Sequence, residues 1–117
     1  GYTFVDGIVG DVGHAVLRDR QVLAEEGVVV VIVTVDHAER EIVTGPEVIT
    51  KGWVHAPEAE ELLDECRETV AAQVMKALEK GETDVESLQR VVRKTAGKLV
   101  SDRTKRRPMI VPVVMAI

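Results

Sequence analysis

The chain has 117 residues, of which 45% are hydrophobic and 30% are charged, and its formal net charge is −5. These values are typical of one globular domain, and the negative charge argues against a chain that binds nucleic acid over its whole surface. Only three residues are aromatic, Tyr2, Phe4 and Trp53. The core must therefore be aliphatic, and a surface that stacks single-stranded bases is not expected.

Residues 1–26 are predicted to form a linker segment. Four glycines fall within the first thirteen positions, and they indicate several turns after a short strand remnant at residues 2–5. Residues 14–26 fit an amphipathic helix that stops at Gly27, and a hairpin fits them almost as well.

Two strands are predicted next. Residues 28–35 are an unbroken β-branched run, which favours a strand at the centre of a sheet. Residues 41–44 follow after a polar break and predict an antiparallel partner, which we expect Gly45-Pro46 to end. An extended connection through Val48, Ile49 and Trp53 is expected before the first helix.

Two helices and a last strand complete the prediction. The first helix is expected to begin near Pro57 and to stop at Gly81, with an apolar stripe at four-residue steps: Leu62, Cys66, Val70, Val74 and Leu78. The Thr83-x-x-Glu86 pattern predicts a capping box for the second helix, which would bury Val85, Leu88, Val92, Ala96 and Leu99. Residues 109–115 predict a strand, and Pro112 places it at a sheet edge.

The predicted fold is α/β, more narrowly α+β, in two layers. Residues 27–117 are expected to form one small domain, a three-stranded mixed sheet covered on one face by two α-helices in the order β-β-α-α-β. The valine-rich strand would be central.

No catalytic or metal constellation is predicted. His14, His37 and His55 are scattered and lack partner ligands, and the single Cys66 fits a reduced core thiol. The Gly10-Asp11-Val12-Gly13 sequence is interpreted as a tight turn, since it lacks the Lys and Ser/Thr of a phosphate-binding loop.

Charge is unevenly distributed along the chain. Six acidic residues fall between Glu58 and Glu68, and their placement on a helix favours an exposed face over paired catalytic carboxylates. Four cations stand just before the last strand, Arg103, Lys105, Arg106 and Arg107. They could bind RNA phosphates, or they could pair with the acids of the first helix or of a neighbouring chain.

The run from Arg103 to Met115, together with Gly45-Pro46 and Gly10-Asp11-Val12-Gly13, resembles the C-terminal end of ribonuclease J. The resemblance extends over nearly the whole chain. It implies a linker and C-terminal domain from an RNA-degrading enzyme with a metallo-β-lactamase core, a β-CASP insertion and two zinc ions, which acts from the RNA 5′ end and also internally. The family's metal ligands would precede Gly1, so none is assigned here and no cofactor is expected in this segment.

The resemblance implies a non-catalytic domain that supports oligomer assembly and the activity of the parent enzyme. The expected partners are a second copy, as in a dimer, and the catalytic domains of the same chain. Trp53 or a sheet surface is the candidate self-association contact. The alternative is an independent RNA-binding domain that uses the basic cluster. The absence of a membrane-spanning run or signal peptide predicts a cytoplasmic location, and the missing initial Met suggests a chain cut from a longer one.

Overall fold

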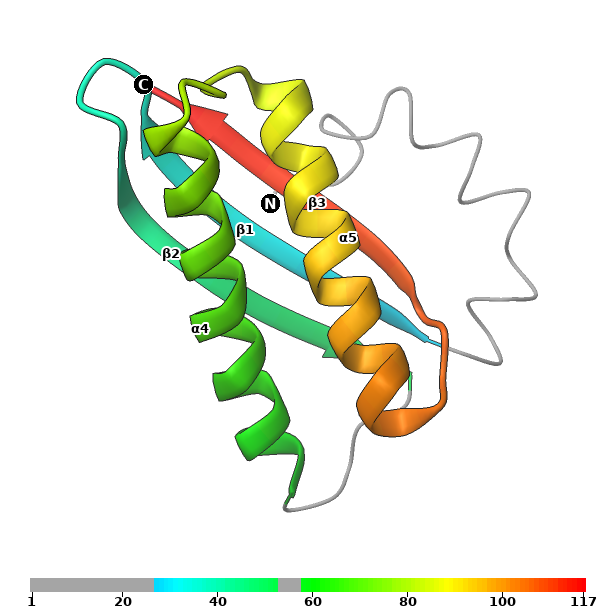
Figure 1. Ribbon diagram of the computed structural model, residues 1–117. Helices are drawn as coiled ribbons and strands as arrows, with labels where there is room; N and C mark the ends of the chain where they lie inside the picture. The colour runs from blue at the N-terminus through cyan, green and yellow to red at the C-terminus, as the bar shows by residue number, and fades with distance from the viewer. Residues whose placement is uncertain (1–26, 53–57) are drawn as a thin grey trace.

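The computed structural model describes residues 27–52 and 58–117, and these form two layers (Figure 1). The elements follow the order β1 (Val28–Asp36), β2 (Glu41–Lys51), α4 (Glu58–Glu79), α5 (Val85–Thr104) and β3 (Met109–Ala116). The strands form one sheet in the order β2-β1-β3, and both helices lie side by side over the same face. The predicted α+β architecture is confirmed.

The central strand, β1, holds the domain together through alternate valines. Val29, Val31, Val33 and Val35 have no exposed surface, and they point toward the helices. The residues between them are only partly buried and point to the other face of the sheet. Because β-branched side chains pack well on a pleated surface, this run is suited to a strand with neighbours on both sides.

The second strand is longer than predicted. It runs antiparallel to β1 and continues through Gly45 and Pro46 to Lys51, so the prediction that Gly45-Pro46 ends the strand is wrong. An edge strand tolerates proline because the backbone amides on its outer side need no hydrogen-bond acceptor in the sheet. Gly45 has φ +92, and a Cβ there would lie 2.6 Å from the carbonyl oxygen of Ile32, so glycine lets the irregular strand pass close to β1.

The third strand runs parallel to β1 at the opposite edge. The amides of Met109 and Ile117 donate to the carbonyls of Gly27 and Val35. In a parallel ladder the amides of alternate residues point to the same neighbouring strand, so the amides of odd-numbered residues point toward β1 and the ring nitrogen of Pro112 points toward the free edge. The predicted edge position of Pro112 is confirmed, and its missing N–H costs no bond within the sheet.

Each helix packs one apolar stripe on the sheet, with α4 over β2 and α5 over β3. The predicted α4 stripe is buried at Cys66, Val70, Val74 and Leu78. On α5 the buried residues are Leu88, Val92, Ala96 and Val100, whereas Val85, expected to be buried, is exposed. Val85 is the first residue of its helix and lies at the end of the stripe.

The two helices are joined by a tight connection. Gly81, at φ +92, donates to the carbonyl of Leu78, and Glu82 donates to that of Ala77, so α4 ends in a Schellman motif as the glycine predicted. The N-cap of α5 is Asp84, whose carboxylate accepts from the amide of Ser87 at 2.9 Å. The capping box on Thr83 is therefore wrong by one residue, because the carboxylate takes the role that was assigned to the threonine hydroxyl.

Shortening a buried side chain on α5 should destabilise the domain far more than the same change at its exposed end. Val92→Ala removes two methyl groups from a fully buried site, so we expect a loss of about 2 kcal/mol in the free energy of unfolding. Val85→Ala makes the same chemical change at the surface and should alter it by less than about 0.5 kcal/mol. Urea unfolding followed by circular dichroism measures both, and equal effects would contradict the assigned core.

The cap of α5 should contribute to the pH dependence of stability. The backbone hydrogen bond from Ser87, then a side-chain hydrogen bond from the same residue, lower the pKa of Asp84 below its usual range. A carboxylate with a lowered pKa in the folded state stabilises above its unfolded pKa, and this contribution is lost as pH falls through the folded pKa. Asp84→Asn keeps a capping oxygen but does not titrate.

We therefore expect the stability of the native protein to fall relative to that of Asp84→Asn as the pH drops below about 4. Urea unfolding at a series of pH values measures this difference. A carboxyl NMR titration of Asp84 with a midpoint at or above that of an ordinary aspartate would contradict the assignment.

Candidate interaction surfaces

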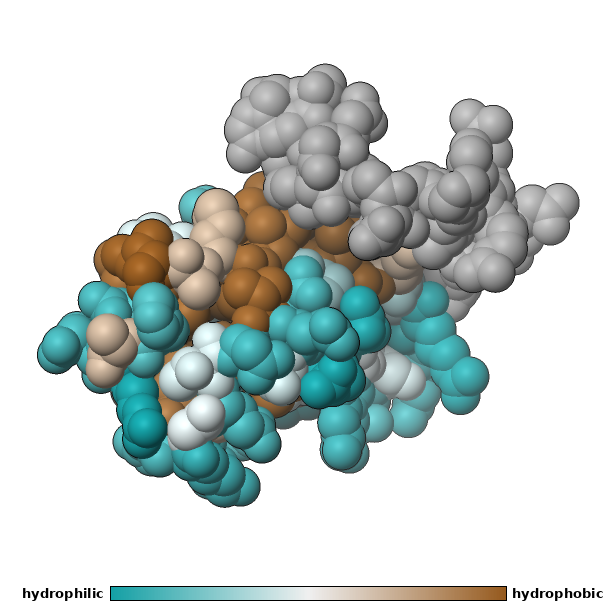
Figure 2. All heavy atoms as spheres, turned by 90° about the horizontal axis from the view of Figure 1, so that it is seen from above, coloured by the Kyte–Doolittle hydropathy of each residue, from teal (hydrophilic) through white to brown (hydrophobic). Residues whose placement is uncertain are grey.

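The face of the sheet opposite the helices is an aliphatic surface, here called the open face. The strand registers place its side chains opposite one another. It consists of Val28, Val30, Ile32, Ile49, Met109, Val111, Val113 and Met115, of which Val113 is buried at 5% exposure. Neither described helix covers it. Apolar atoms gather on the side of the molecule away from the charged helices (Figure 2).

Large exposed apolar side chains also concentrate on the sheet. Among the described residues, Ile49 is 46% exposed and Met115 is 48% exposed on the open face, and Val43 and Ile117 lie at the end of the sheet near the β1–β2 turn. On the helices only Val85 is in this class, at 36%. A contiguous apolar surface rimmed by polar groups is typical of an interaction site, because its exposure to water is unfavourable.

The rim of the open face on β2 carries opposite charges. Glu47 pairs with Ile32 and Lys51 pairs with Val28 across the antiparallel ladder, so both side chains project to the same side as the open face. Both residues are exposed. A surface with an apolar centre and a rim that offers both signs of charge can complement itself.

The helical layer divides its charge between the two helices. Helix α4 has seven acidic and two basic residues, a formal charge of −5. Helix α5 has two acidic and five basic residues, a formal charge of +3, and three further cations follow it before β3. The uneven charge distribution seen along the sequence thus becomes an acidic helix beside a basic one.

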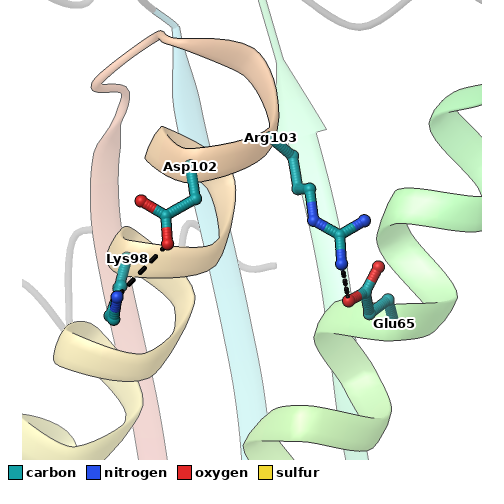
Figure 3. Close-up of polar contacts among 4 residues, drawn as sticks. All are labelled: Glu65, Lys98, Asp102 and Arg103. Atoms are coloured by element: carbon teal, nitrogen blue, oxygen red, sulfur yellow. Dashed lines mark hydrogen bonds and ion pairs between the residues drawn. The ribbon is translucent and has the colours of Figure 1, made fainter.

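The four cations predicted as a possible RNA-binding cluster lie in different local settings. Arg103, in the last turn of α5, donates to the carboxylate of Glu65 on α4 (Figure 3). The alternative that the cluster pairs with acids of the first helix therefore holds for Arg103. Lys105 is the C-cap of α5, at φ +62, and Arg106 and Arg107 are exposed in the turn that leads to β3.

The RNA-binding cluster predicted from the sequence left out the cations on the outward surface of α5. Arg93 and Lys94 are exposed and make no ion pair within the described part of the chain. Lys98 pairs with Asp102 at 3.3 Å, also drawn in Figure 3, and Arg90 lies 3.7 Å from Glu86. Their positions off the buried stripe were the signal that could have identified them.

Comparisons with known proteins identify the family of the chain. Residues 15–117 match the model of the ribonuclease J C-terminal domain. The chain belongs to this family. It is 36% identical to ribonuclease J2 of Bacillus subtilis, 43% identical to ribonuclease J 2 of Staphylococcus epidermidis and 42% identical to that of Staphylococcus aureus. Each match includes all of this chain and 21% of the relative, so the chain spans about a fifth of the relatives' length.

In this ribonuclease J C-terminal domain, several predicted residues lie outside the described part. These are His14, His55, Trp53 and the linker at residues 1–26. His37 lies in the β1–β2 turn, and its Nδ1 is 2.7 Å from the carbonyl oxygen of Ile117. Within residues 27–52 and 58–117, no three His, Cys, Asp or Glu side chains come together as metal ligands, and neither helix there is long and apolar enough to cross a membrane.

The thiol of Cys66 is part of the core, as its helical position predicted. It is 1% exposed. Burial raises its pKa, and of the two adjacent charges the Arg67 guanidinium lowers the pKa and the Glu65 carboxylate raises it. Since the thiolate is the reactive form, a buried thiol with a raised pKa is inert.

We therefore expect Cys66 to resist a thiol reagent such as Ellman's reagent in the native protein and to react rapidly in denaturant. At pH 8 the labelling rate should be limited by opening of the domain, so Val92→Ala should increase it. Val85→Ala is the matched control and should leave it unchanged. Rapid labelling of the folded protein would contradict the buried position.

Proposed function

We propose that this chain is the C-terminal portion of a zinc-dependent ribonuclease of the ribonuclease J type, one that degrades RNA from the 5′ end and cuts it internally during RNA processing and decay. In this proposal the domain supplies no catalytic group. It supports the activity of the catalytic domains by assembling copies of the enzyme. The match to the ribonuclease J C-terminal domain supports the proposed parent enzyme. The buried thiol of Cys66 suits a reducing cytoplasm.

The open face is the observation that carries the assembly role. Its centre is made of aliphatic side chains from all three strands, and the described helices leave it uncovered. Burying such a surface against another is favourable in proportion to the apolar area removed from water. The helical layer, in contrast, presents mainly charged side chains, which are costly to bury.

A second copy of the same chain fits this face. When two sheets pack about a two-fold axis, the same surface of each copy makes the contact. Glu47 of one copy can then approach Lys51 of the other. The two residues lie at the same rim with opposite charges. The proposed contact is therefore an isologous sheet-on-sheet dimer with an aliphatic centre.

Light scattering over a wide range of protein concentration tests the proposal. We expect the native chain to approach the mass of a dimer as its concentration rises. Ile49→Lys places a charge on an exposed position of the open face and should shift the protein toward monomer by at least about tenfold in the dissociation constant. Val85→Lys makes a matched change at an exposed residue of the helical layer and should leave the mass unchanged.

Circular dichroism establishes that both variants are folded. A native chain that stays monomeric at every concentration, or equal effects of the two variants, would overturn the assembly role of the open face. Trp53→Ala in the same assay tests the other candidate contact. If assembly is unchanged, Trp53 is not part of the self-association contact.

A further inference from the structure

We infer that the outward face of α5 and the turn after it bind the sugar-phosphate backbone of RNA. The residues assigned to this surface, here called the α5 strip, are Arg90, Arg93, Lys94, Lys98, Lys105 and Arg106. The choice of RNA as the bound polyanion rests on the proposed function. The strip itself rests on the charges and geometry of the described residues.

The spacing of the α5 strip produces a straight row of cations. Arg90, Lys94 and Lys98 follow at four-residue steps, which places them on one side of the helix about 6 Å apart along its axis. The buried stripe of α5 faces the sheet, so this row faces solvent. Lys105 and Arg106 extend the row beyond the C-terminal end of the helix, where the macrodipole favours cations. Both residues are exposed.

The cations of the α5 strip are available to a ligand. Arg93 and Lys94 have no ionic partner within the described residues. Arg90 pairs with Glu86 and also donates to the hydroxyl of Ser87 at 3.2 Å, and Lys98 pairs with Asp102. These partners are all on the same helix, and the side chains in both ion pairs are more than half exposed. Exposed pairs of this kind are weak, so a phosphate can replace the carboxylate.

The neighbouring helix sets the boundary of the strip. Helix α4 is strongly acidic, so its field repels a polyanion and confines it to the side of the layer above β3. Arg103 lies on this boundary and is paired with Glu65. The α5 strip therefore differs from the cluster predicted from the sequence. It leaves out Arg103 and Arg107, and it includes cations that lie one to four helical turns before Arg103.

A protein partner fits the α5 strip less well than RNA. The acidic α4 of a second copy would match its charge, but protein interfaces also need a buried apolar centre. The only large apolar side chain exposed on α5 is Val85, at the first residue of the helix. Phosphates need no such centre, because their binding is driven by charge and by the release of counterions.

The chemistry also fixes the kind of recognition. The described residues include no Phe, Tyr or Trp side chain on which a base could stack. The α5 strip therefore contacts phosphates, and its affinity should depend little on sequence and fall steeply with salt.

Fluorescence anisotropy with a labelled single-stranded oligouridine tests the inference on the whole 117-residue chain. Arg93→Gln with Lys94→Gln removes the two unpaired cations. Lys76→Gln with Lys80→Gln removes two exposed cations from α4 and the residue after it, with the same change in net charge. In 50 mM salt we expect the α5 pair to weaken binding about tenfold, and to make the salt dependence shallower by about 1.4 in the log–log slope, for two lost phosphate contacts.

The control pair should have less than about a twofold effect on the RNA affinity. NMR shifts on titration with the oligouridine should map to α5 and to the turn at residues 105 and 106. Equal weakening by the two pairs would overturn the inference, because net charge alone would then explain the attraction. Undetectable binding in 50 mM salt would also overturn it.

A change in solution mass in the α5 pair, without a change in RNA affinity, would assign the strip to a second copy instead. These outcomes are independent of the assembly test. Ile49→Lys changes the open face and leaves the α5 strip intact, so failure of the dimer does not imply failure of RNA binding.

Discussion

The packing of one valine face of β1 against two helices is the contact on which the rest of the domain depends. Val29, Val31, Val33 and Val35 are all fully buried, and every other described element either pairs with β1 or packs on its sheet. Branched side chains at alternate positions leave little rotamer freedom to lose, so a small aliphatic core can still be well defined. The domain does this without a large aromatic residue in its described core.

The same strand also explains why a second apolar surface exists. Val28, Val30 and Ile32 alternate with the buried valines, and the register adds apolar residues from both edge strands beside them. A strand covered by helices on one face only would normally be polar on the other. β1 is therefore apolar on both faces, which supports the proposed contact of the open face with a second copy.

The sequence predicted those parts of the fold that depend on local chemistry. The β-branched run, the glycine stop at Gly81 and the edge proline Pro112 each act through the backbone of a single element, and each was confirmed. The continuation of β2 through Gly45-Pro46 was not predicted, because both residues interrupt regular strands. Their tolerance here depends on an edge position and on the nearness of Ile32, which are tertiary facts.

The candidate surfaces were harder to predict for the same reason. Linear proximity grouped Arg103 with the next three cations, but the helix pair brings Glu65 to Arg103 across 38 positions of sequence. The open face was expected only in general terms, since its members come from three strands whose register no local pattern specifies. The cap moved from Thr83 to Asp84, a choice between adjacent residues that both favour capping.

The two surfaces respond to different physical conditions because they lie on opposite layers. Apolar burial on the open face is largely insensitive to ionic strength, whereas attraction at the α5 strip is screened over about 10 Å at 0.1 M salt. Separation by the full thickness of the domain lets one surface be occupied without covering the other. An assembly built through the sheets would therefore leave every copy of α5 facing outward, and several linked strips would bind one RNA more tightly than one strip alone.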